Sequence, residues 1–206
     1  MSIEDLNVKD VYNKIANEFN NTRYRPWTCV ENFLDNIPKN SIIGDIGCGN
    51  GKNMLYRKDC TNIGCDFSEN LVSICIQKNL NVISGDILNI PFKDNTFDYT
   101  ICIAVIHHLS TEEKRKKAIS ELIRVTKPNG KILILVWALE QEPDSRRKFT
   151  QQNNMVEWKD KKQNLLGIRY YYVFKKNEIE SLLPNNITLN LSFYEKGNWG
   201  IILSKS

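Results

Sequence analysis

The sequence predicts an α/β protein built on a doubly wound, mostly parallel sheet. Short apolar strands alternate with helical segments over much of the chain, and this alternation indicates a parallel sheet with helices on both faces. The final two apolar segments, 187–194 and 199–203, are joined by only four residues. So short a connection cannot cross over a sheet, so these two strands are expected to pair antiparallel.

The expected elements follow in chain order. Apolar residues recur at helical spacing from Asp5 to Phe19, and Pro26 marks the start of a second helix. Five short apolar segments are expected to be strands, namely 42–46, 62–66, 80–84, 97–105 and 131–137. Ser68 is expected to cap a helix after the second strand. Thr111 opens a charged, solvated helix that ends near residues 127–130, and a last helix is expected over 177–183.

Length and composition favour one domain over residues 1–206. The chain is 41% hydrophobic, which suffices for a core and excludes wholesale disorder. No apolar run approaches the roughly 20 residues that span a bilayer, so we expect no membrane segment, and the acidic N-terminus predicts no secretory signal. The six cysteines include no Cys-x-x-Cys pair. We therefore expect no metal site, reduced thiols, and a cytoplasmic or nuclear location.

The net charge of +4 is unevenly distributed. Residues 143–176 contain nine basic and three acidic side chains, so this segment carries +6 and the remainder carries −2. Aromatic residues, including Phe149, Trp158 and the run 170–172, are interleaved with the basic ones. Such a pattern suits phosphates and unstacked bases. A solvated loop followed by a tyrosine-rich strand is the alternative interpretation.

A glycine loop follows the first strand. In the segment 45–51, Gly47, Gly49 and Gly51 allow a tight turn and close approach of a ligand, and Asp66 ends the second strand, where it can bind ribose hydroxyls. A dinucleotide would require Gly-x-Gly-x-x-Gly to hold its pyrophosphate. The Gly-x-Gly-x-Gly spacing, led by Asp45, instead suits a ligand with an ammonium group and no phosphate, such as S-adenosylmethionine. A tight turn without a ligand is the alternative.

Asp86 ends the third strand, where a carboxylate can accept a hydrogen bond from an adenine amino group. With the segment 91–98, these features make residues 11–137 resemble the class I S-adenosylmethionine-dependent methyltransferases. The resemblance implies a Rossmann-like sheet of seven strands with an antiparallel last strand, and S-adenosylmethionine as cofactor. It implies cofactor contacts at Asp45, Gly47, Cys48, Gly49, Asp66, Phe67, Asp86, Ile87 and Ala104. We then expect helices in 1–38, the cofactor-binding core in 39–140, and a substrate-facing basic segment with the antiparallel strands in 141–206.

Further motifs are similar to those of the eukaryotic tRNA wobble-uridine methyltransferases, which esterify 5-carboxymethyluridine. These motifs lie at 22–27, 103–108, 137–141, 169–172 and 198–199. In animals the same domain occurs fused to a dioxygenase. The resemblance implies a tRNA anticodon loop as substrate and a small zinc-binding activator protein on the exposed edge strand, residues 80–83. Two departures are a nearly absent insertion, of which only 159–163 remains, and Gly200, where a second tryptophan is common.

The implied reaction is an in-line displacement in which a carboxylate oxygen attacks the methyl carbon. The carboxylate has a pKa of ~4 and is already ionised at neutral pH, so no general base is needed. The reaction instead needs a pocket without water and a carboxylate oxygen aligned about 3–3.5 Å from the methyl carbon. The candidate catalytic residues are His108, Arg146 and Tyr24. The candidate substrate-binding residues are Arg23, Trp137, Arg147, Tyr171 and Trp199. Packing or solvation is the alternative role for each. A methyltransferase for a small molecule or lipid, and a catalytically silent nucleic-acid module, are the alternative functions.

Overall fold

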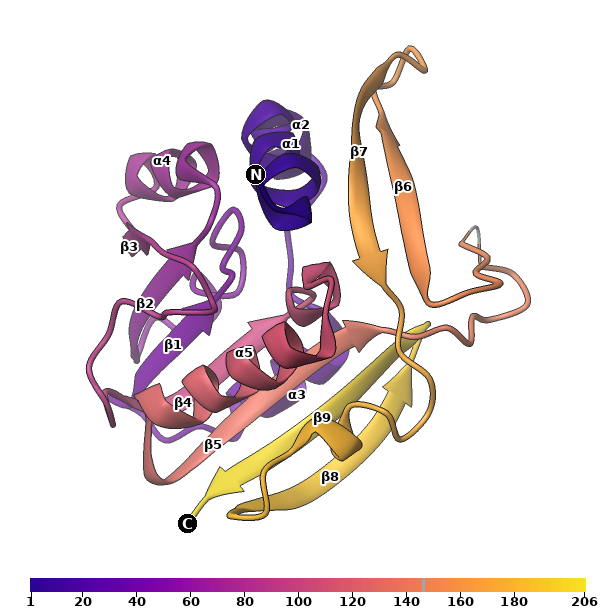
Figure 1. Ribbon diagram of the computed structural model, residues 1–206. Helices are drawn as coiled ribbons and strands as arrows, with labels where there is room; N and C mark the ends of the chain where they lie inside the picture. Colours follow the sequence, from indigo (N-terminus) through magenta and orange to yellow (C-terminus); the bar gives the residue numbers. More distant parts are fainter. Residues whose placement is uncertain (146) are drawn as a thin grey trace.

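The computed structural model describes residues 1–145 and 147–206, and its centre is a seven-stranded sheet (Figure 1). The strands lie in the order β3-β2-β1-β4-β5-β9-β8. Their bounds are β1 Ile42–Ile46, β2 Thr61–Asp66, β3 Asn81–Ser84, β4 Phe97–Ile103, β5 Thr126–Trp137, β8 Ile187–Glu195 and β9 Asn198–Lys205. Strand β9 is antiparallel to β5 and β8, whereas the other neighbouring pairs are parallel. The predicted fold class is confirmed.

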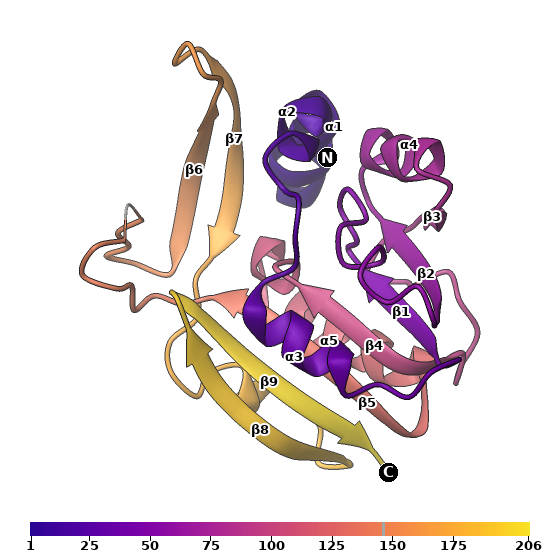
Figure 2. The ribbon, with the colours of Figure 1, turned by 180° about the vertical axis from the view of Figure 1, so that it is seen from behind.

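Helices cover both faces of this sheet. Helix α5 (Glu112–Val125) lies on one face and α3 (Thr28–Asp35) on the other (Figures 1 and 2). In β5, Ile132 and Ile134 are buried in the apolar cluster of α5, whereas Leu133 and Leu135 are buried in the cluster of α3. Successive strand residues point to opposite faces, so this continuous apolar run is buried only between two helical layers.

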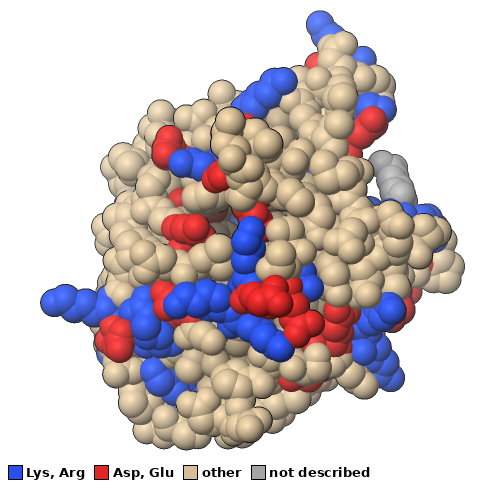
Figure 3. Space-filling view, viewed as in Figure 1, with Lys and Arg blue, Asp and Glu red and all other residues tan. Residues whose placement is uncertain are grey.

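The predicted helix caps are present. The Ser68 hydroxyl accepts a hydrogen bond from the amide of Leu71 at 3.2 Å at the start of α4 (Glu69–Gln77). The Thr111 hydroxyl accepts one from the amide of Lys114 at the start of α5. Helix α5 ends at Val125, and β5 begins at once, earlier than the predicted strand start at 131. Figure 3 shows the mixed charges of the exposed helix surface.

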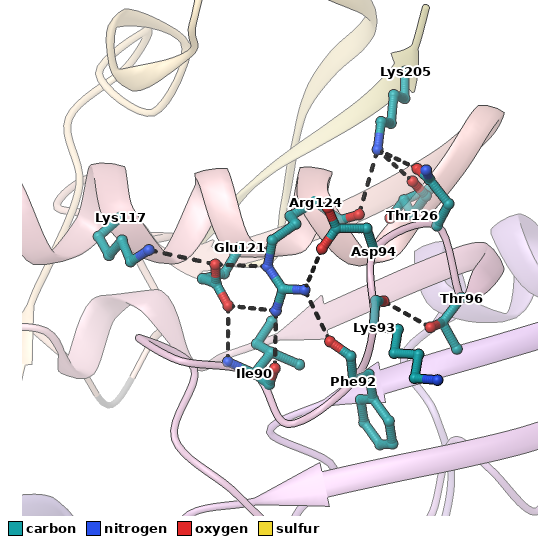
Figure 4. Close-up of polar contacts among 11 residues, drawn as sticks. Ile90, Phe92, Lys93, Asp94, Thr96, Lys117, Glu121, Arg124, Thr126 and Lys205 are labelled. Atoms are coloured by element: carbon teal, nitrogen blue, oxygen red, sulfur yellow. Dashed lines mark hydrogen bonds and ion pairs between the residues drawn. The ribbon is translucent and has the colours of Figure 1, made fainter.

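A polar cluster fastens the loop after β3 to α5 (Figure 4). Arg124 donates to the backbone oxygens of Ile90 at 2.9 Å and Phe92 at 2.8 Å, and to the Asp94 carboxylate at 2.8 Å. Glu121 pairs with Arg124 at 2.7 Å and accepts from the Ile90 amide at 2.9 Å. These contacts hold the pKa of Glu121 at about 2, chiefly through Arg124. The loop that follows β3 is thereby held in place against α5.

Strands β6 (Asn153–Lys159) and β7 (Leu165–Tyr172) form a separate antiparallel hairpin that rises from the sheet (Figures 1 and 2). A tyrosine-rich strand was expected here, but β6 was not. Its residues alternate between exposed and half-buried because only one face of the hairpin is covered. The sequence of β6 therefore lacks the apolar run that marks a buried strand.

The N-terminal helix is present as three short consecutive segments, η1 (Asp5–Lys9), α1 (Asp10–Lys14) and α2 (Ala16–Asn20). They lie between α4 and the hairpin (Figure 1). Glu4 fastens this end of the chain, because its carboxylate accepts from the Ser110 amide at 2.8 Å and from Lys114 at 2.6 Å. Gly167 of β7 lets the hairpin approach α1 closely, since a Cβ there would lie 2.5 Å from a methyl group of Val11.

One expected helix is largely missing. Residues 177–183 contain only the short 3₁₀ turn η3 (Glu180–Leu182), and Asn177, the predicted first residue, has a left-handed backbone with φ of 61°. Strands β8 and β9 pair antiparallel as predicted. Strand β3 lies at the predicted edge of the sheet. No helix among the described residues is long and apolar enough to cross a membrane.

Candidate active site

A cavity of about 450 Å³ opens at the carboxyl ends of the parallel strands. Its walls come from the ends of β1, β2, β3 and β4 on one side, and from the N-terminal helices and β7 on the other. Ligands of open α/β sheets bind at this edge. The N-terminal helices and the β6–β7 hairpin thus meet over the strand ends and enclose one space.

The glycine loop forms the floor of the cavity. Gly47, Gly49 and Gly51 all have positive φ, of 77°, 57° and 75°. The amides of Gly47 and Cys48 donate to the Cys65 carbonyl at 2.8 and 3.0 Å. A side chain at Gly47 would lie 2.2 Å from Val105. Only glycine fits this tight turn, which brings the backbone up to the cavity.

The predicted cofactor residues line the cavity, with one exception. Gly47, Cys48, Gly49, Asp66, Phe67, Asp86, Ile87 and Ala104 are among its lining residues. Asp66 accepts from the amides of Gly49 at 2.7 Å and Ser68 at 2.9 Å. Burial raises the pKa of Asp66, and these amide contacts oppose the rise. Asp86 accepts from the Leu88 amide at 2.9 Å, so both carboxylates are held in place by backbone.

Asp45 is the exception, because it is fully buried beside the loop and outside the lining. One of its oxygens lies 3.5 Å from the Asn53 side-chain amide, and Oδ1 has no hydrogen-bond partner among the described residues. Burial raises the pKa of Asp45 to about 7. A buried, orphaned carboxylate oxygen favours a ligand with donor groups nearby. Asp66 and Asp86, which line the cavity, fit the ribose and adenine of S-adenosylmethionine, and Asp45 lies behind the loop as a negative charge that favours its ammonium group.

The opposite wall of the cavity is aromatic. Trp137 stacks on Tyr171 with ring centroids 4.1 Å apart and an angle of 9°. The Arg147 guanidinium lies 4.3 Å from the Trp137 ring centroid. Two groups at such distances cannot share one face of the indole, so both faces are covered. A base could stack on Trp137 only if Arg147 moved away.

His108 lines the cavity, and both of its ring nitrogens are already hydrogen-bonded. Nδ1 lies 2.8 Å from the Tyr170 carbonyl, which can only accept, so Nδ1 carries the proton. Nε2 therefore accepts from the Tyr12 hydroxyl at 3.0 Å. Burial lowers the pKa of His108 to about 3, so the imidazole stays neutral. His108 thus orients Tyr12 and has no free donor for a substrate carboxylate.

The neighbouring His107, on the short turn η2 (Ile106–His108), has the opposite tautomer. Its Nδ1 accepts from the Trp137 amide at 3.0 Å, which places the proton on Nε2. Nε2 makes no hydrogen bond within the described part of the chain, and His107 lines the cavity. Burial lowers the pKa of His107 well below its usual value.

The other predicted residues divide into two groups. Arg23, Trp137 and Tyr171 line the cavity. Tyr24 is 81% exposed and donates to the Asn21 carbonyl, so the structure directs it away from the cavity. Trp199 packs edge-on against Tyr194 and donates to Glu140 at 3.0 Å, also outside the lining. Arg147 reaches the cavity only through Trp137, and Arg146 lies outside the described residues.

Sequence reasoning missed several cavity residues, among them Tyr12, Lys52 and Arg169. Tyr12 was interpreted only as an apolar residue of a helix, and its hydroxyl gives no signal in a periodic pattern. Lys52 follows the glycine loop directly. Arg169 was counted within the basic segment and the Arg-Tyr-Tyr-Tyr motif, but a buried arginine cannot be told from a solvated one by its position in a sequence.

The sequence was compared with protein families and with curated proteins. A family model described as a methyltransferase domain matches residues 44–134. A tRNA (carboxymethyluridine(34)-5-O)-methyltransferase of Schizosaccharomyces pombe is 39% identical over 230 residues and is matched over 100% of both chains. Proteins of the same description are 49% identical in Arabidopsis thaliana, over 69% of this chain, and 35% identical in Xenopus tropicalis, over 99% of this chain. The chain spans 35% and 41% of those two relatives, less than half their length.

Solved structures share the fold at low identity. An S-adenosylmethionine-dependent methyltransferase of Methanosarcina mazei has a TM-score of 0.69 and 16% identity, over 88% of this chain and 98% of that one. A complex between the Haloferax volcanii Trm112 methyltransferase activator and a methyltransferase matches with a TM-score of 0.68 and 12% identity, over 96% and 97%. The fold is that of the S-adenosylmethionine-dependent methyltransferases, and the full-length match to the Schizosaccharomyces pombe protein shows that the chain belongs to the tRNA carboxymethyluridine methyltransferase family.

Proposed function

We propose that this chain transfers a methyl group from S-adenosylmethionine to the carboxylate of 5-carboxymethyluridine at the wobble position of tRNA, forming the methyl ester. The observation that carries the proposal is one cavity whose two ends differ in their hydrogen-bonding groups. One end presents the carboxylates of Asp66 and Asp86 beside the glycine loop, and the other presents aromatic rings and hydrogen-bond donors. The names of the relatives supply the substrate.

For this reaction the protein has mainly to position the two reactants and to exclude water from the cavity. S-adenosylmethionine, when bound, supplies the methyl group. Asp66 and Asp86 would hold its ribose and adenine, and the backbone of Gly47 would lie against its methionine part. The accepting carboxylate is ionised at neutral pH, so no residue has to remove a proton. The neutral histidines fit this requirement, because neither needs to act as a base.

The tRNA would meet the protein along the hairpin. Lys159, Lys161 and Lys162 lie at its outer end and are exposed. Basic side chains gather at this end in Figure 3. The inner end of the same hairpin forms a cavity wall through Tyr171. A strand of nucleic acid whose phosphates contact the lysines could thus extend a base into the cavity.

A small zinc-binding activator protein would pair with the edge strand β3. That strand is open on one side, and Ile83 is 40% exposed. An apolar, unpaired edge favours addition of a strand from a partner. An activator complex of a protein with this fold is known from Haloferax volcanii. The proposal also locates the chain in the cytoplasm or nucleus, where its free thiols would stay reduced.

The test uses tRNA carrying 5-carboxymethyluridine, methyl-labelled cofactor, and the protein with and without activator. We expect label in the wobble nucleoside, released by mild base as an ester requires. Label that is stable to base, or that lies elsewhere in the tRNA, would contradict the proposal. Transfer to a small acid or lipid extract in place of tRNA would favour the alternative substrate class, which no feature of the described cavity supports.

A further inference from the structure

Arg169 of β7 is a buried cation without a carboxylate partner in the described part of the chain. The residue is only 6% exposed. Its Nη1 donates to the Tyr171 hydroxyl at 2.5 Å and lies 3.4 Å from the Tyr12 hydroxyl, while Nε has no partner. Its guanidinium stacks 4.7 Å from the centre of the Trp158 ring. An unpaired buried charge is costly, so a protein keeps one where a ligand of opposite sign compensates it.

The hydrogen-bond network around Arg169 leaves only donors free. His108 accepts the Tyr12 proton through Nε2, so the Tyr12 oxygen faces Arg169 as an acceptor. The Tyr171 oxygen accepts from Nη1, and its own O–H is directed to the Tyr12 oxygen, 3.4 Å away. Burial raises the pKa of Tyr171 well above its usual value, so the hydroxyl keeps its proton. Nη2 of Arg169 makes no hydrogen bond to any described residue, and Arg169 lines the cavity.

The two ends of the cavity are therefore electrostatically opposite. The end with Asp66 and Asp86 accepts hydrogen bonds, and the end with Arg169 donates them. A carboxylate matches the free nitrogen of a guanidinium that the Tyr171 hydroxyl holds in position.

A carboxylate could come from the target nucleoside or from the methionine part of the cofactor. Lys52 and Arg23 are the cavity-lining cations beside the glycine loop, and they are close enough to oppose each other electrostatically. The Arg23 carbonyl accepts from Asn50 of that loop at 2.8 Å. These two residues suit the cofactor carboxylate and leave Arg169 for the nucleoside.

We propose that Arg169 and Tyr171 form the subsite for the substrate carboxylate; this rests on the proposed function. Because Nη1 is engaged by Tyr171 and Nε is buried, Nη2 is the guanidinium nitrogen left for a ligand, and Arg169 offers no bidentate pair. A single hydrogen bond holds one carboxylate oxygen and leaves the second oxygen free to attack. The new bond joins that oxygen to the methyl carbon as the carbon–sulfur bond breaks, and the bonding pair stays on sulfur. A bidentate grip would stabilise the ground state as well.

The test compares two anticodon stem-loops that differ only at position 34, one with a carboxymethyl group and one with the neutral carbamoylmethyl amide. We expect wild type to bind the acid at least tenfold tighter than the amide, and Arg169→Gln to lose that preference. The variant should bind S-adenosylmethionine within twofold of wild type, as measured by calorimetry. Tyr171→Phe keeps the stacked ring and should reduce the preference for the acid by a smaller factor. This variant provides the test if Arg169→Gln folds poorly.

Arg115→Gln is the matched control. Arg115 is 5% exposed and stacks 3.6 Å from the Tyr172 ring centre, outside the cavity lining. Its loss should leave the acid preference unchanged. An undiminished preference in Arg169→Gln and Tyr171→Phe would overturn the assignment. So would a selective loss of cofactor binding in Arg169→Gln, since the subsite would then hold the methionine carboxylate. Failure of wild type to methylate the acid would instead sink the proposed function, because the binding ratio is measured without turnover.

Discussion

The carboxyl group of Asp45 is fully buried, and burial raises its pKa to about 7. An unfolded aspartate has a pKa near ~3.9. Between these values the folded chain holds a proton that the unfolded chain has lost, so stability falls as the pH rises, by up to about 1.4 kcal/mol per pH unit. Below ~3.9 both states are protonated and the effect vanishes.

Replacing the Asp45 carboxyl group should therefore raise the stability of the fold while it lowers the affinity for the cofactor. We expect Asp45→Asn to be more stable than wild type by about 4 kcal/mol at pH 7.5 and by only about 1 kcal/mol at pH 4.5. Cofactor binding should weaken, because an amide carries no charge to attract an ammonium group. Urea unfolding at the two pH values and calorimetry check both points. Equal stability differences at the two pH values, or unchanged cofactor affinity, would contradict this account of Asp45.

Burial lowers the pKa of both histidines, to about 3 for His108 and well below the usual value for His107. Both rings should stay neutral between pH 5.5 and 8.5. The pH profile of kcat should consequently show no inflexion from either ring in this range. A step near pH 6.5 that disappears in His108→Gln would show that an imidazolium takes part in the reaction.

At the scale of elements, the hairpin β6–β7 both lines the cavity and presents basic side chains to solvent. Trp158 packs against Phe19 of α2, and Tyr171 lines the cavity, whereas the outer turn carries exposed lysines. Trp158 and its cross-strand partner Gly167 thus hold the hairpin against the N-terminal helices close to the outer turn, where the lysines are left free to contact phosphates.

Removing the outer lysines should weaken tRNA binding through salt-dependent contacts. For alanine at Lys159, Lys161 and Lys162 together, we expect the slope of log affinity against log salt to shrink by about 0.7 for each lost phosphate contact. Cofactor affinity should not change. The matched control carries alanine at Lys39, Lys58 and Lys116, which lie elsewhere on the surface. An equal loss of slope in the control would mean that the hairpin is not the tRNA contact.

Elements with a strong local signal were predictable from sequence, and those set by tertiary packing were not. The glycine loop, the caps at Ser68 and Thr111 and the apolar strands carry their signals in neighbouring residues. Strand β6 depends on the distant N-terminal helices for its one covered face. The roles of Tyr12 and Arg169 likewise depend on each other across the fold, at 3.4 Å between Nη1 and the hydroxyl, and no local pattern encodes that meeting.

At the scale of the whole molecule, the N-terminal helices and the β6–β7 hairpin close over a sheet that carries the cofactor features. The +6 segment forms one wall of this closure, so the position of the charge matters more than its total of +4. The sheet leaves two edges, β3 and β8. Only β3 belongs to the half of the sheet that carries the glycine loop and Asp66.

A charged side chain on β3 should weaken binding of an activator protein to that strand. We expect Ile83→Lys to weaken the activator complex at least tenfold in calorimetry, because the apolar edge would have to bury an ammonium group. Leu191→Lys on β8, a residue 50% exposed in wild type, is the control and should bind normally. If the chain alone is monodisperse and binds cofactor with full affinity, an obligatory partner is not needed.

The central claim is that one cavity brings a methyl donor to a carboxylate on an RNA base. The most direct measurement is mass spectrometry of nucleosides after incubating the protein, its activator and S-adenosylmethionine with two stem-loops, one bearing carboxymethyluridine and the other its carbamoylmethyl analogue at position 34. The account predicts a methyl ester on the acid and no methylation of the amide. Methylation of both stem-loops at the ribose or the base ring, or of neither while the cofactor is bound, would contradict it.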